Sequence, residues 1–314
     1  MGDQAPATSD IHAHGVRRAE ILLAFAAIYV IWGSTYLAIR FAIETLPPFL
    51  MAASRFLVAG PLLYAWARWR GAARPAPGHW RAAAVVGALL LLGGNGAVVW
   101  AEQRVPSGVT ALLVAMVPLW MVLLDWLRPG GVRPTLAVFS GVALGLAGLV
   151  LLVGPEQILG GEHVDHAGAL ALAFGCLTWS IGSVYSRHAP LPASPQLATA
   201  MEMVAGGALL LVASLARGEW QQLAAQAISL RSLAALAYLV VFGSLVALTA
   251  YVWLLRQTTP ARVSTYAYVN PVVAMLLGWA LAGEPLSART LVAAAVIVGG
   301  VVLITRSKVR AAGA

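Results

Sequence analysis

Apolar runs of about 20 residues, separated by short polar or Pro/Gly-rich segments, dominate this sequence. Because a helix rises 1.5 Å per residue, about 20 apolar residues are needed to cross the hydrocarbon core of a bilayer. Of the 314 residues, 60% are hydrophobic and only 10% are charged, whereas about a quarter of a soluble domain is charged. The sequence therefore predicts an all-α polytopic membrane protein.

Ten runs have the length and hydropathy of membrane-spanning helices. The predicted spans are residues 20–39, 48–67, 81–101, 105–127, 134–153, 167–186, 196–216, 231–254, 260–282 and 286–305. The connecting segments are too short for a soluble domain. Because ten is an even number, the tails at residues 1–19 and 306–314 lie on the same side of the membrane.

The basic residues indicate which side that is, because Lys and Arg in short loops are retained in the cytoplasm. With the N-terminus inside, 14 of the 20 basic residues lie on the cytoplasmic side, 5 lie outside, and Arg55 lies within a span. We therefore expect both termini in the cytoplasm of a bacterium and the spans in its inner membrane. The basic residues form no polybasic cluster, so the net charge of +8 does not indicate a nucleic-acid partner.

A repeated string points to an internal duplication. The string "WGSTYLAIR" at residues 32–40 returns as "WSIGSVYSR" at residues 179–187, a shift of 147 residues. The same shift aligns Pro48 with Pro195 and Gly60 with Gly207, and a shift of 154 aligns Gln103 with Gln257, Pro106 with Pro260 and Val109 with Val263. Residues 20–153 and 167–305 therefore form two repeats of five predicted spans each.

Because five is an odd number, the second repeat has to cross the membrane in the opposite sense to the first. The fold class is thus ten transmembrane helices as two inverted five-helix repeats. Inverted halves that enclose a site near the middle of the membrane are typical of secondary transporters. The alternative is a duplicated bundle with a scaffold or receptor role.

Two charged residues, Arg55 and Glu202, lie well inside the predicted spans, where charges are costly and suggest function. Arg55 follows Pro48 by seven residues and Glu202 follows Pro195 by seven, so the shift of 147 makes the two positions equivalent. We expect them to bind the carboxylate and the ammonium group of a zwitterion, or to gate a cavity. The alternative is that polar neighbours or water satisfy each charge inside the bundle.

Polar and aromatic residues within the spans complete the candidate site. Amides in a span should face protein or a wet cavity, since lipid offers them no partner, and stacked aromatic rings suit amphiphilic organic molecules. The candidate substrate-binding residues are Trp32, Tyr36, Arg55, Asn95, Trp100, Trp179, Glu202, Tyr251, Tyr266 and Asn270. Trp100 has an alternative role as an anchor at the membrane interface. Helix packing is the expected role of Gly141, Gly145, Gly148, Gly299 and Gly300.

Signals of catalysis are absent from the sequence. All six histidines fall in predicted tails or loops, so they form no metal pair or proton relay within the membrane. The single cysteine, Cys176, excludes an intrachain disulfide, and there is no Walker A sequence for ATP. We expect no catalytic residue, no metal and no cofactor. A lipid-modifying enzyme would need clustered His or Asp residues near one membrane interface.

Three strings resemble the EamA family of the drug/metabolite transporter superfamily: "WGSTYLAIRF", "PSGVTALLVAMVPLW" and "YAYVNPVVAMLLGWALAGEPLS". The resemblance covers nearly all of residues 20–305, and the spacing is similar to YedA-type members and, more broadly, to YddG-type amino acid exporters. The Gly-Glu-Pro at residues 283–285 matches the family's Gly-Glu turn, whereas "LRPGGVRP" in the first half lacks the Glu. The resemblance implies a substrate cavity lined by spans 1 to 4 and 6 to 9, with spans 5 and 10 peripheral.

These observations predict a secondary transporter that exports small amphiphilic metabolites, above all amino acids, across the inner membrane by alternating access. Its partners are then the small-molecule substrate and membrane lipid. The alternative function is efflux of drugs or toxic cations, for which Glu202 would supply the counter-charge. Proton coupling or facilitated diffusion, and a monomer or a homodimer, remain as alternatives.

Overall fold

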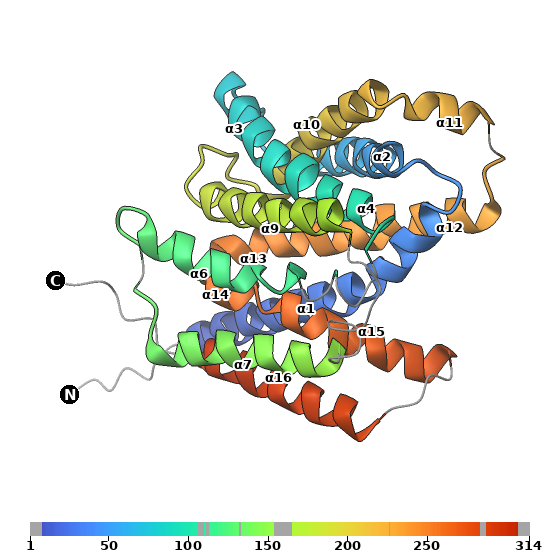
Figure 1. The fold of residues 1–314 in the computed structure, drawn as a ribbon. Helices are drawn as coiled ribbons and strands as arrows, with labels where there is room; N and C mark the ends of the chain where they lie inside the picture. Colours follow the sequence, from blue (N-terminus) through green and yellow to red (C-terminus); the bar gives the residue numbers. More distant parts are fainter. Residues whose placement is uncertain are drawn as a thin grey trace, which may run out of the picture.

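The computed structural model describes residues 8–105, 110, 113–131, 133–153, 165–225, 227–282 and 287–306. Every regular element in these ranges is a helix, and the helices pack side by side in one bundle (Figure 1). The predicted all-α class is therefore confirmed.

The first half contains seven helical elements among the described residues. They are α1 (Thr8–Ala42), α2 (Pro48–Trp69), α3 (Pro77–Gly87), η1 (Ala88–Asn95), α4 (Gly96–Ala101), α6 (Val117–Leu127) and α7 (Leu136–Val153). Pro48 and Pro77 begin their helices because proline is pre-organised for the first helical position, where its missing N–H is not needed. Helix α1 begins at Thr8, earlier than the predicted start of the first span at residue 20.

The second half contains nine helical elements among the described residues. They are α9 (His166–Ser186), α10 (Pro195–Ala216), α11 (Glu219–Ala225), α12 (Leu230–Tyr238), η2 (Leu239–Leu248), α13 (Thr249–Gln257), α14 (Pro260–Val263), α15 (Tyr266–Ala282) and α16 (Ala288–Arg306). Side chains cap several N-termini: Asp165 accepts a hydrogen bond from the Gly168 amide, and Ser194 from the Leu197 amide. Each cap satisfies an N–H group that would otherwise lack a partner.

Six of the described helical segments are long and apolar enough to cross a membrane: Arg18–Ala42, Pro48–Trp69, Pro77–Ala101, His166–Ser186, Pro195–Ala216 and Leu230–Gln257. Each coincides with a predicted span. The shorter apolar helices Val117–Leu127, Leu136–Leu152 and Leu291–Arg306 overlap three further predicted spans. The Gly-Glu-Pro turn at residues 283–285, and Pro106 and Val109 of the repeat, lie outside the described residues.

A π-helix interrupts the third long helical segment of each half. Segment η1 covers residues 88–95 and η2 covers residues 239–248; the shift of 154 that relates the repeats carries the first onto residues 242–249, which overlap the second. π-Helical turns are rare and are frequently found at functional sites. Hydropathy alone predicts uninterrupted spans here, so these paired interruptions are a finding of the structure.

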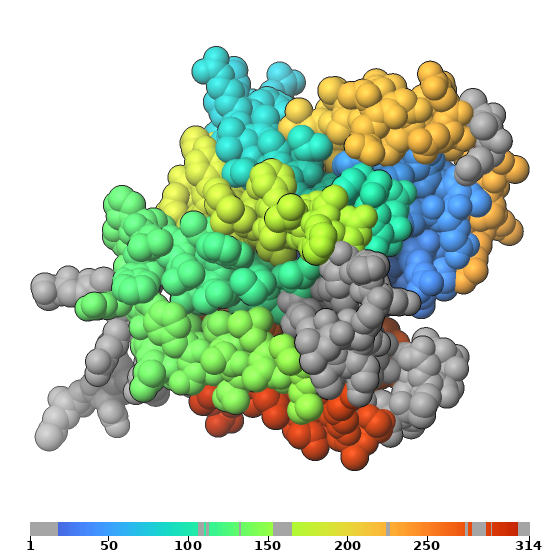
Figure 2. Space-filling model, in the orientation of Figure 1, coloured from blue at the N-terminus to red at the C-terminus, as the bar shows by residue number. Residues whose placement is uncertain are grey.

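The contacts between helices have the same pattern in both halves. Helix α2 packs on its counterpart α10, and α7 packs on its counterpart α16. Helix α9 contacts η1 and α6, while its counterpart α1 contacts η2 and α15. Exchanging the halves therefore converts one set of contacts into the other. The α2/α10 and α7/α16 pairs lie on opposite edges of the bundle (Figure 1), and α7 rests directly on α16 in Figure 2.

Counterpart helices run antiparallel where they meet. Gly60 of α2 lies against Ala200 and Val204 of α10, while Gly207, further along α10, lies against Leu57, which precedes Gly60. Because the contact positions advance in opposite directions along the two chains, α2 and α10 are antiparallel. This is the relation expected of two inverted repeats.

The same holds for α7 and α16, where glycines allow the backbones to approach closely. A Cβ atom at Gly141 would lie 2.7 Å from the Gly300 carbonyl oxygen, and one at Gly148 would lie 3.0 Å from the Ile297 nitrogen. Small residues at such contacts are typical of membrane helices. Gly299, which we expected to serve helix packing, does not lie at this contact, since a Cβ atom there would meet nothing within 4 Å.

Candidate functional site

One cavity lies between the two halves, in the part of the bundle where α1 ends at Ala42 and α2 begins at Pro48, here called the α1–α2 end. Its lining includes Tyr36 and Ile39 near the end of α1 and Arg55 near the start of α2. The cavity offers about 90 Å³ to the centres of water molecules, and one water needs roughly 10–15 Å³ on that measure. It therefore has room for several waters or for a small organic molecule.

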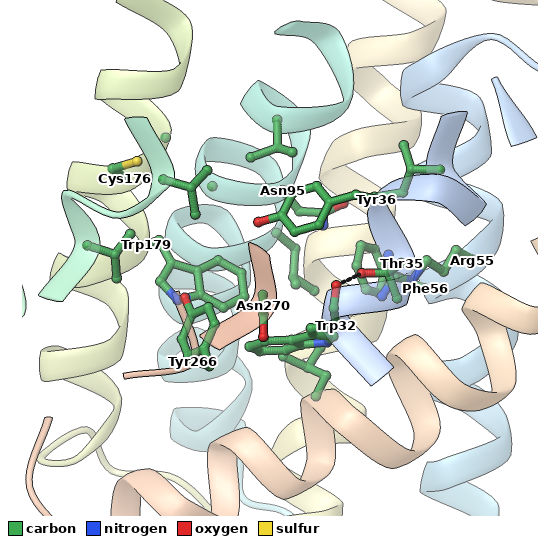
Figure 3. A pocket seen from close by; sticks show the side chains of 18 residues that line it. Trp32, Thr35, Tyr36, Arg55, Phe56, Asn95, Cys176, Trp179, Tyr266 and Asn270 are labelled. Atoms are coloured by element: carbon green, nitrogen blue, oxygen red, sulfur yellow. Dashed lines mark hydrogen bonds between the residues drawn. The ribbon is translucent and has the colours of Figure 1, made fainter. Parts of the chain in front are cut away.

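Three aromatic rings, those of Trp32, Trp179 and Tyr266, form the floor of this cavity and are here called the aromatic floor; the ring of Tyr251 packs behind them. The ring of Trp32 lies 5.7 Å from that of Trp179, 5.1 Å from that of Tyr251 and 4.9 Å from that of Tyr266, measured between centroids. Figure 3 shows Trp32, Trp179 and Tyr266 gathered on one side of the cavity. Tilted and edge-to-face contacts at these distances are favourable.

Hydrogen bonds hold the aromatic floor together on the side away from the cavity. The Trp179 Nε1 group donates to the Tyr251 hydroxyl at 2.9 Å, and that hydroxyl also shares a hydrogen bond of 2.6 Å with Ser183. Tyr251 and Ser183 are both fully buried. Ser183 lies near the opposite end of the bundle, where α9 ends at Ser186 and α10 begins at Pro195, here called the α9–α10 end. The floor thus closes the cavity toward that end.

Arg55 is the one charged side chain among the described residues that line the cavity. It is 4% exposed, its Nε group donates to the Ser244 hydroxyl of η2 at 2.7 Å, and its guanidinium lies 4.9 Å from the centroid of the Phe56 ring. No carboxylate forms an ion pair with Arg55 within the described part of the chain. A guanidinium presents five N–H donors in a planar fork, so most of the donors of Arg55 are available to a ligand.

Amide and hydroxyl groups supply the remaining polar surface. The Asn95 Oδ1 atom is buried and has no hydrogen-bond partner among the described residues. The Asn270 amide lies 3.0 Å from the Tyr266 carbonyl oxygen and 3.2 Å from the Tyr29 carbonyl oxygen, which its nitrogen can reach as a donor. Tyr36 and Asn95 lie across the cavity from the aromatic floor (Figure 3). A buried acceptor without a partner is unusual, so Asn95 is available to a ligand.

Seven of the ten candidate residues line this cavity: Trp32, Tyr36, Arg55, Asn95, Trp179, Tyr266 and Asn270. The other three do not. Tyr251 lies behind the aromatic floor and is fully buried. Trp100 lies at the end of α4, with the guanidinium groups of Arg104 and Arg217 at 4.7 and 6.0 Å from its ring centroid. That placement fits the alternative role of an interface anchor.

Glu202 is not brought together with Arg55 in one cavity. It is 1% exposed, and neither carboxylate oxygen has a hydrogen-bond partner among the described residues. It lies about two turns into α10 from the α9–α10 end, whereas Arg55 lies about two turns into α2 from the α1–α2 end. The expected zwitterion site between the two charges is therefore not formed in this conformation, because equivalent positions in antiparallel counterparts lie near opposite ends.

The cavity also contains residues that the sequence analysis does not select. They are Thr35, Ile39, Phe56, Leu91, Gly94, Val98, Val114, Val117, Gly175, Cys176 and Leu248. Several follow from helical spacing: Trp32, Thr35, Tyr36 and Ile39 share one face of α1, and positions three and four apart are neighbours on a helix. Extending Trp32 and Tyr36 along this face would have found Thr35 and Ile39.

Glu102 is a further polar group close to the cavity. Its Oε2 atom is buried without a hydrogen-bond partner among the described residues, and its carboxyl group acts electrostatically on Tyr36. Glu102 immediately follows α4. It falls outside the predicted span, so a search for charges within spans passes over it.

No group of three or more His, Cys, Asp or Glu side chains that could hold a metal ion occurs in the described ranges. The described residues that line the cavity have the composition of a binding site: one cation, two amides and an aromatic wall. Small-molecule sites are usually apolar clefts with a few placed polar groups. A helical membrane protein built from two similar halves around such a cavity has the architecture of a transport protein.

Comparison with known proteins identifies the class more closely. The EamA-like transporter family matches residues 18–154 and 166–306, one match in each half. The chain belongs to this family, and it is therefore a membrane transporter and not an enzyme.

Several relatives span nearly the whole chain. The inner membrane transporter YedA of Escherichia coli K12 is 44% identical over 286 residues, which cover 91% of this chain and 90% of YedA. Protein PecM of Dickeya dadantii is 28% identical over 278 residues, which cover 87% of this chain and 88% of PecM. A solved crystal structure superposes with a TM-score of 0.76 at 25% identity, over 92% of this chain and 98% of its own. The overall arrangement of helices is thus shared with a solved structure.

Proposed function

We propose that this transporter exports small metabolites that carry a carboxylate, above all amino acids, across the bacterial inner membrane. Transport proceeds by alternating access between two inverted halves of five spans each. The observation that carries the proposal is the buried Arg55 guanidinium on the cavity wall, which has no carboxylate partner within the described part of the chain. Arg is well suited to bind a carboxylate with two parallel hydrogen bonds.

The size and lining of the cavity support a small amphiphilic substrate. About 90 Å³ at water centres accommodates a molecule that replaces several waters. Trp32, Trp179 and Tyr266 offer an apolar wall, while Asn95 and Asn270 offer amides beside the charge. A free amino acid carries matching groups: a carboxylate for Arg55, an ammonium group for the amide oxygens and a side chain for the apolar wall.

Efflux of drugs or lipophilic cations is the competing function, and the charge of the cavity argues against it. A cation efflux site needs an acidic counter-charge, and Glu202 lies away from the cavity. The one charge among the described lining residues is positive. A buried charge without an opposite partner costs several kcal/mol. A permanently cationic substrate beside Arg55 would lack such a partner, so Arg55 disfavours it.

Alternating access is supported by the paired contacts of the two halves. Counterpart helices α2 and α10 pack antiparallel, and exchanging the halves reproduces the other helix contacts. Only the α1–α2 end holds the cavity described here, and the aromatic floor seals it from the α9–α10 end. The distribution of Lys and Arg favours cytoplasmic termini, so we propose that the α1–α2 end faces outward and that this conformation is the outward-facing state.

The purified protein in proteoliposomes tests this function. We expect uptake of labelled amino acids without ATP, and competition by free amino acids but not by their methyl esters, which keep the ammonium group and lose the carboxylate. Loss of a hydrogen bond to a charged group costs about 1.5–3 kcal/mol, so Arg55→Gln should raise the KM about 10- to 100-fold. Arg55→Lys, which keeps the charge, should be affected less.

Two results would overturn the proposal. The first is no flux above empty liposomes across all amino acids. The second is flux of tetraphenylphosphonium that competes with the esters and is unchanged in Arg55→Gln, which would establish the cation-efflux function instead.

A further inference from the structure

We infer that Glu202 and Thr249 form a second polar site, closed in this conformation, that binds the ammonium group of the substrate when the bundle opens at the α9–α10 end. The inference rests on alternating access in the proposed function and goes beyond it. It assigns opposite charges to the two open states, Arg55 to one and Glu202 to the other.

The repeat makes this pair the counterpart of residues that line the cavity described above. A shift of 147 carries Arg55 onto Glu202, and a shift of 154 carries Asn95 onto Thr249. Arg55 and Asn95 both line the cavity near the α1–α2 end. When two halves exchange conformations, a residue takes over the environment of its counterpart. Glu202 and Thr249 should then line the cavity of the opposite state.

The helices around Glu202 are also the counterparts of those around Arg55. Helix α2, which carries Arg55, packs on η2 and on α4, the helix that follows η1. Helix α10, which carries Glu202, packs on η1 and on α13, the helix that follows η2. The walls for a second cavity are therefore present, and here they are closed against each other.

Unpartnered polar atoms mark the closed site. Both carboxylate oxygens of Glu202 and the hydroxyl oxygen of Thr249 are buried without a hydrogen-bond partner among the described residues. Burial of an unpaired polar group costs free energy, and such atoms are few in native proteins. Hydration or ligand binding in another conformation accounts for their retention at these two positions.

The Glu202 carboxylate can bind a cation, because its basic neighbour Arg256 is bonded elsewhere. Arg256 of α13 acts electrostatically on Glu202. However, the Arg256 Nη1 group donates at 3.2 Å to the carbonyl oxygens of Pro192 and Ala193, and it forms no ion pair with Glu202. The carboxylate is therefore free to bind an ammonium group once the site opens. A zwitterion satisfies both states, through its carboxylate at Arg55 and its ammonium at Glu202.

Cysteine labelling tests this site without any substrate. Cys176 is the single cysteine, so Cys176→Ser provides a cysteine-free background in which serine can still donate to the Leu113 carbonyl oxygen as Cys176 does. Asn95→Cys and Thr249→Cys are placed separately in that background. A membrane-impermeant maleimide is then added to spheroplasts or to inside-out vesicles. We expect Asn95→Cys to react only in spheroplasts and Thr249→Cys only in inside-out vesicles.

A second reporter guards against a poorly folded Thr249 variant. Met203 is the counterpart of Phe56 under the shift of 147 and is fully buried here. Met203→Cys should react from the same face as Thr249→Cys. Labelling of both from the face that labels Asn95→Cys, or from neither face, would overturn the inference.

Flux measurements test the ammonium group. In proteoliposomes we expect Glu202→Gln to reduce the flux of an amino acid at least 10-fold, while the flux of its N-acetyl derivative, which lacks the ammonium, changes less than 2-fold. An equal loss for both compounds would contradict ammonium binding. If no amino acid is transported but the labelling is sided as expected, the proposed substrate is wrong and the second opening stands.

Discussion

The Trp32 Nε1 group donates a hydrogen bond of 3.3 Å to the Gly243 carbonyl oxygen, and so joins the first copy of the repeated string to the π-helix of the other half. Gly243 also lies against Arg55: a Cβ atom there would come within 2.7 Å of a guanidinium nitrogen. One residue of η2 therefore supports both the aromatic floor and the charge on the cavity wall. A π-helix is a frequent device at functional sites, and here it presents a glycine to the arginine.

Gly243→Ala should therefore weaken substrate binding while the protein stays folded. The added methyl group displaces the Arg55 guanidinium, and we expect the KM for amino acid uptake to rise about 10-fold, which corresponds to roughly 1.4 kcal/mol. Gly78→Ala is the control, because a Cβ atom at Gly78 would meet nothing within 4 Å. An unchanged KM in Gly243→Ala would show that Arg55 moves without consequence for binding.

Tyr251→Phe should loosen the aromatic floor. The substitution removes the acceptor of the Trp179 indole N–H and one of two hydrogen bonds of the Ser183 hydroxyl, and an unsatisfied buried donor costs about 1–3 kcal/mol. We expect a lower Tm in detergent and a faster leak of substrate from loaded liposomes. Tyr185→Phe, on the exposed side of α9, should change neither. A Tyr251→Phe protein with wild-type Tm and leak would exclude this role.

Gly141→Ala should destabilise the contact between α7 and α16. The added Cβ atom would lie 2.7 Å from the Gly300 carbonyl oxygen and 2.6 Å from Ile304 Cγ1, and overpacking of this kind costs about 1–3 kcal/mol. Thermal unfolding in detergent measures the effect. Gly299→Ala, in the same helix pair, has open space around its Cβ position and should leave the Tm unchanged or raise it. Equal Tm values for the two variants would refute the assigned packing.

Glu102→Gln should stabilise the protein at high pH and leave it unchanged at low pH. Burial raises the pKa of Glu102 from 4.5 to about 8, so between these values the folded state holds a proton that the unfolded chain releases. The contribution of Glu102 to the free energy of unfolding is therefore fully present below pH 4.5 and is lost as the pH rises toward 8. Glutamine stays neutral and avoids this decline.

Tm values measured at pH 4.5 and pH 8.5 check this prediction. The exposed Glu20 provides the matched control, Glu20→Gln, which should show no such pH-dependent difference. A Glu102→Gln effect of the same size at both pH values would show that the carboxyl group does not change its protonation on folding.

Hydropathy and proline placement account for most of what was predictable about the fold. The span predicted at residues 48–67 is the helix Pro48–Trp69, and that at residues 196–216 is Pro195–Ala216. Helices α2 and α10 both begin with a proline. Proline favours the first helical position through its own fixed φ angle, so these starts can be predicted from the local sequence. The π-helices η1 and η2 were not predictable, because a π turn depends on packing against other helices as well as on the residues within it.

The residues of the candidate site were likewise predictable only in part. Asn95 and Asn270 were selectable because amides in a span should face protein or a wet cavity, and Trp32 because aromatic rings suit amphiphilic molecules. Val114 and Leu248, which line the same cavity, carry no such signal, since an apolar side chain in a span is equally suited to lipid. Only the folded bundle distinguishes those that face the substrate.

The sequence by itself determined the membrane location, the family and the two repeats, because hydropathy and spacing are properties of the chain. It also determined that Arg55 and Glu202 are equivalent positions. Only the tertiary structure decided that Arg55 lines the cavity while Glu202 is enclosed. In antiparallel counterparts, equivalent residues lie near opposite ends of the bundle. The aromatic floor closes this cavity from the α9–α10 end, and that closure depends on contacts between the two halves that neither repeat contains alone.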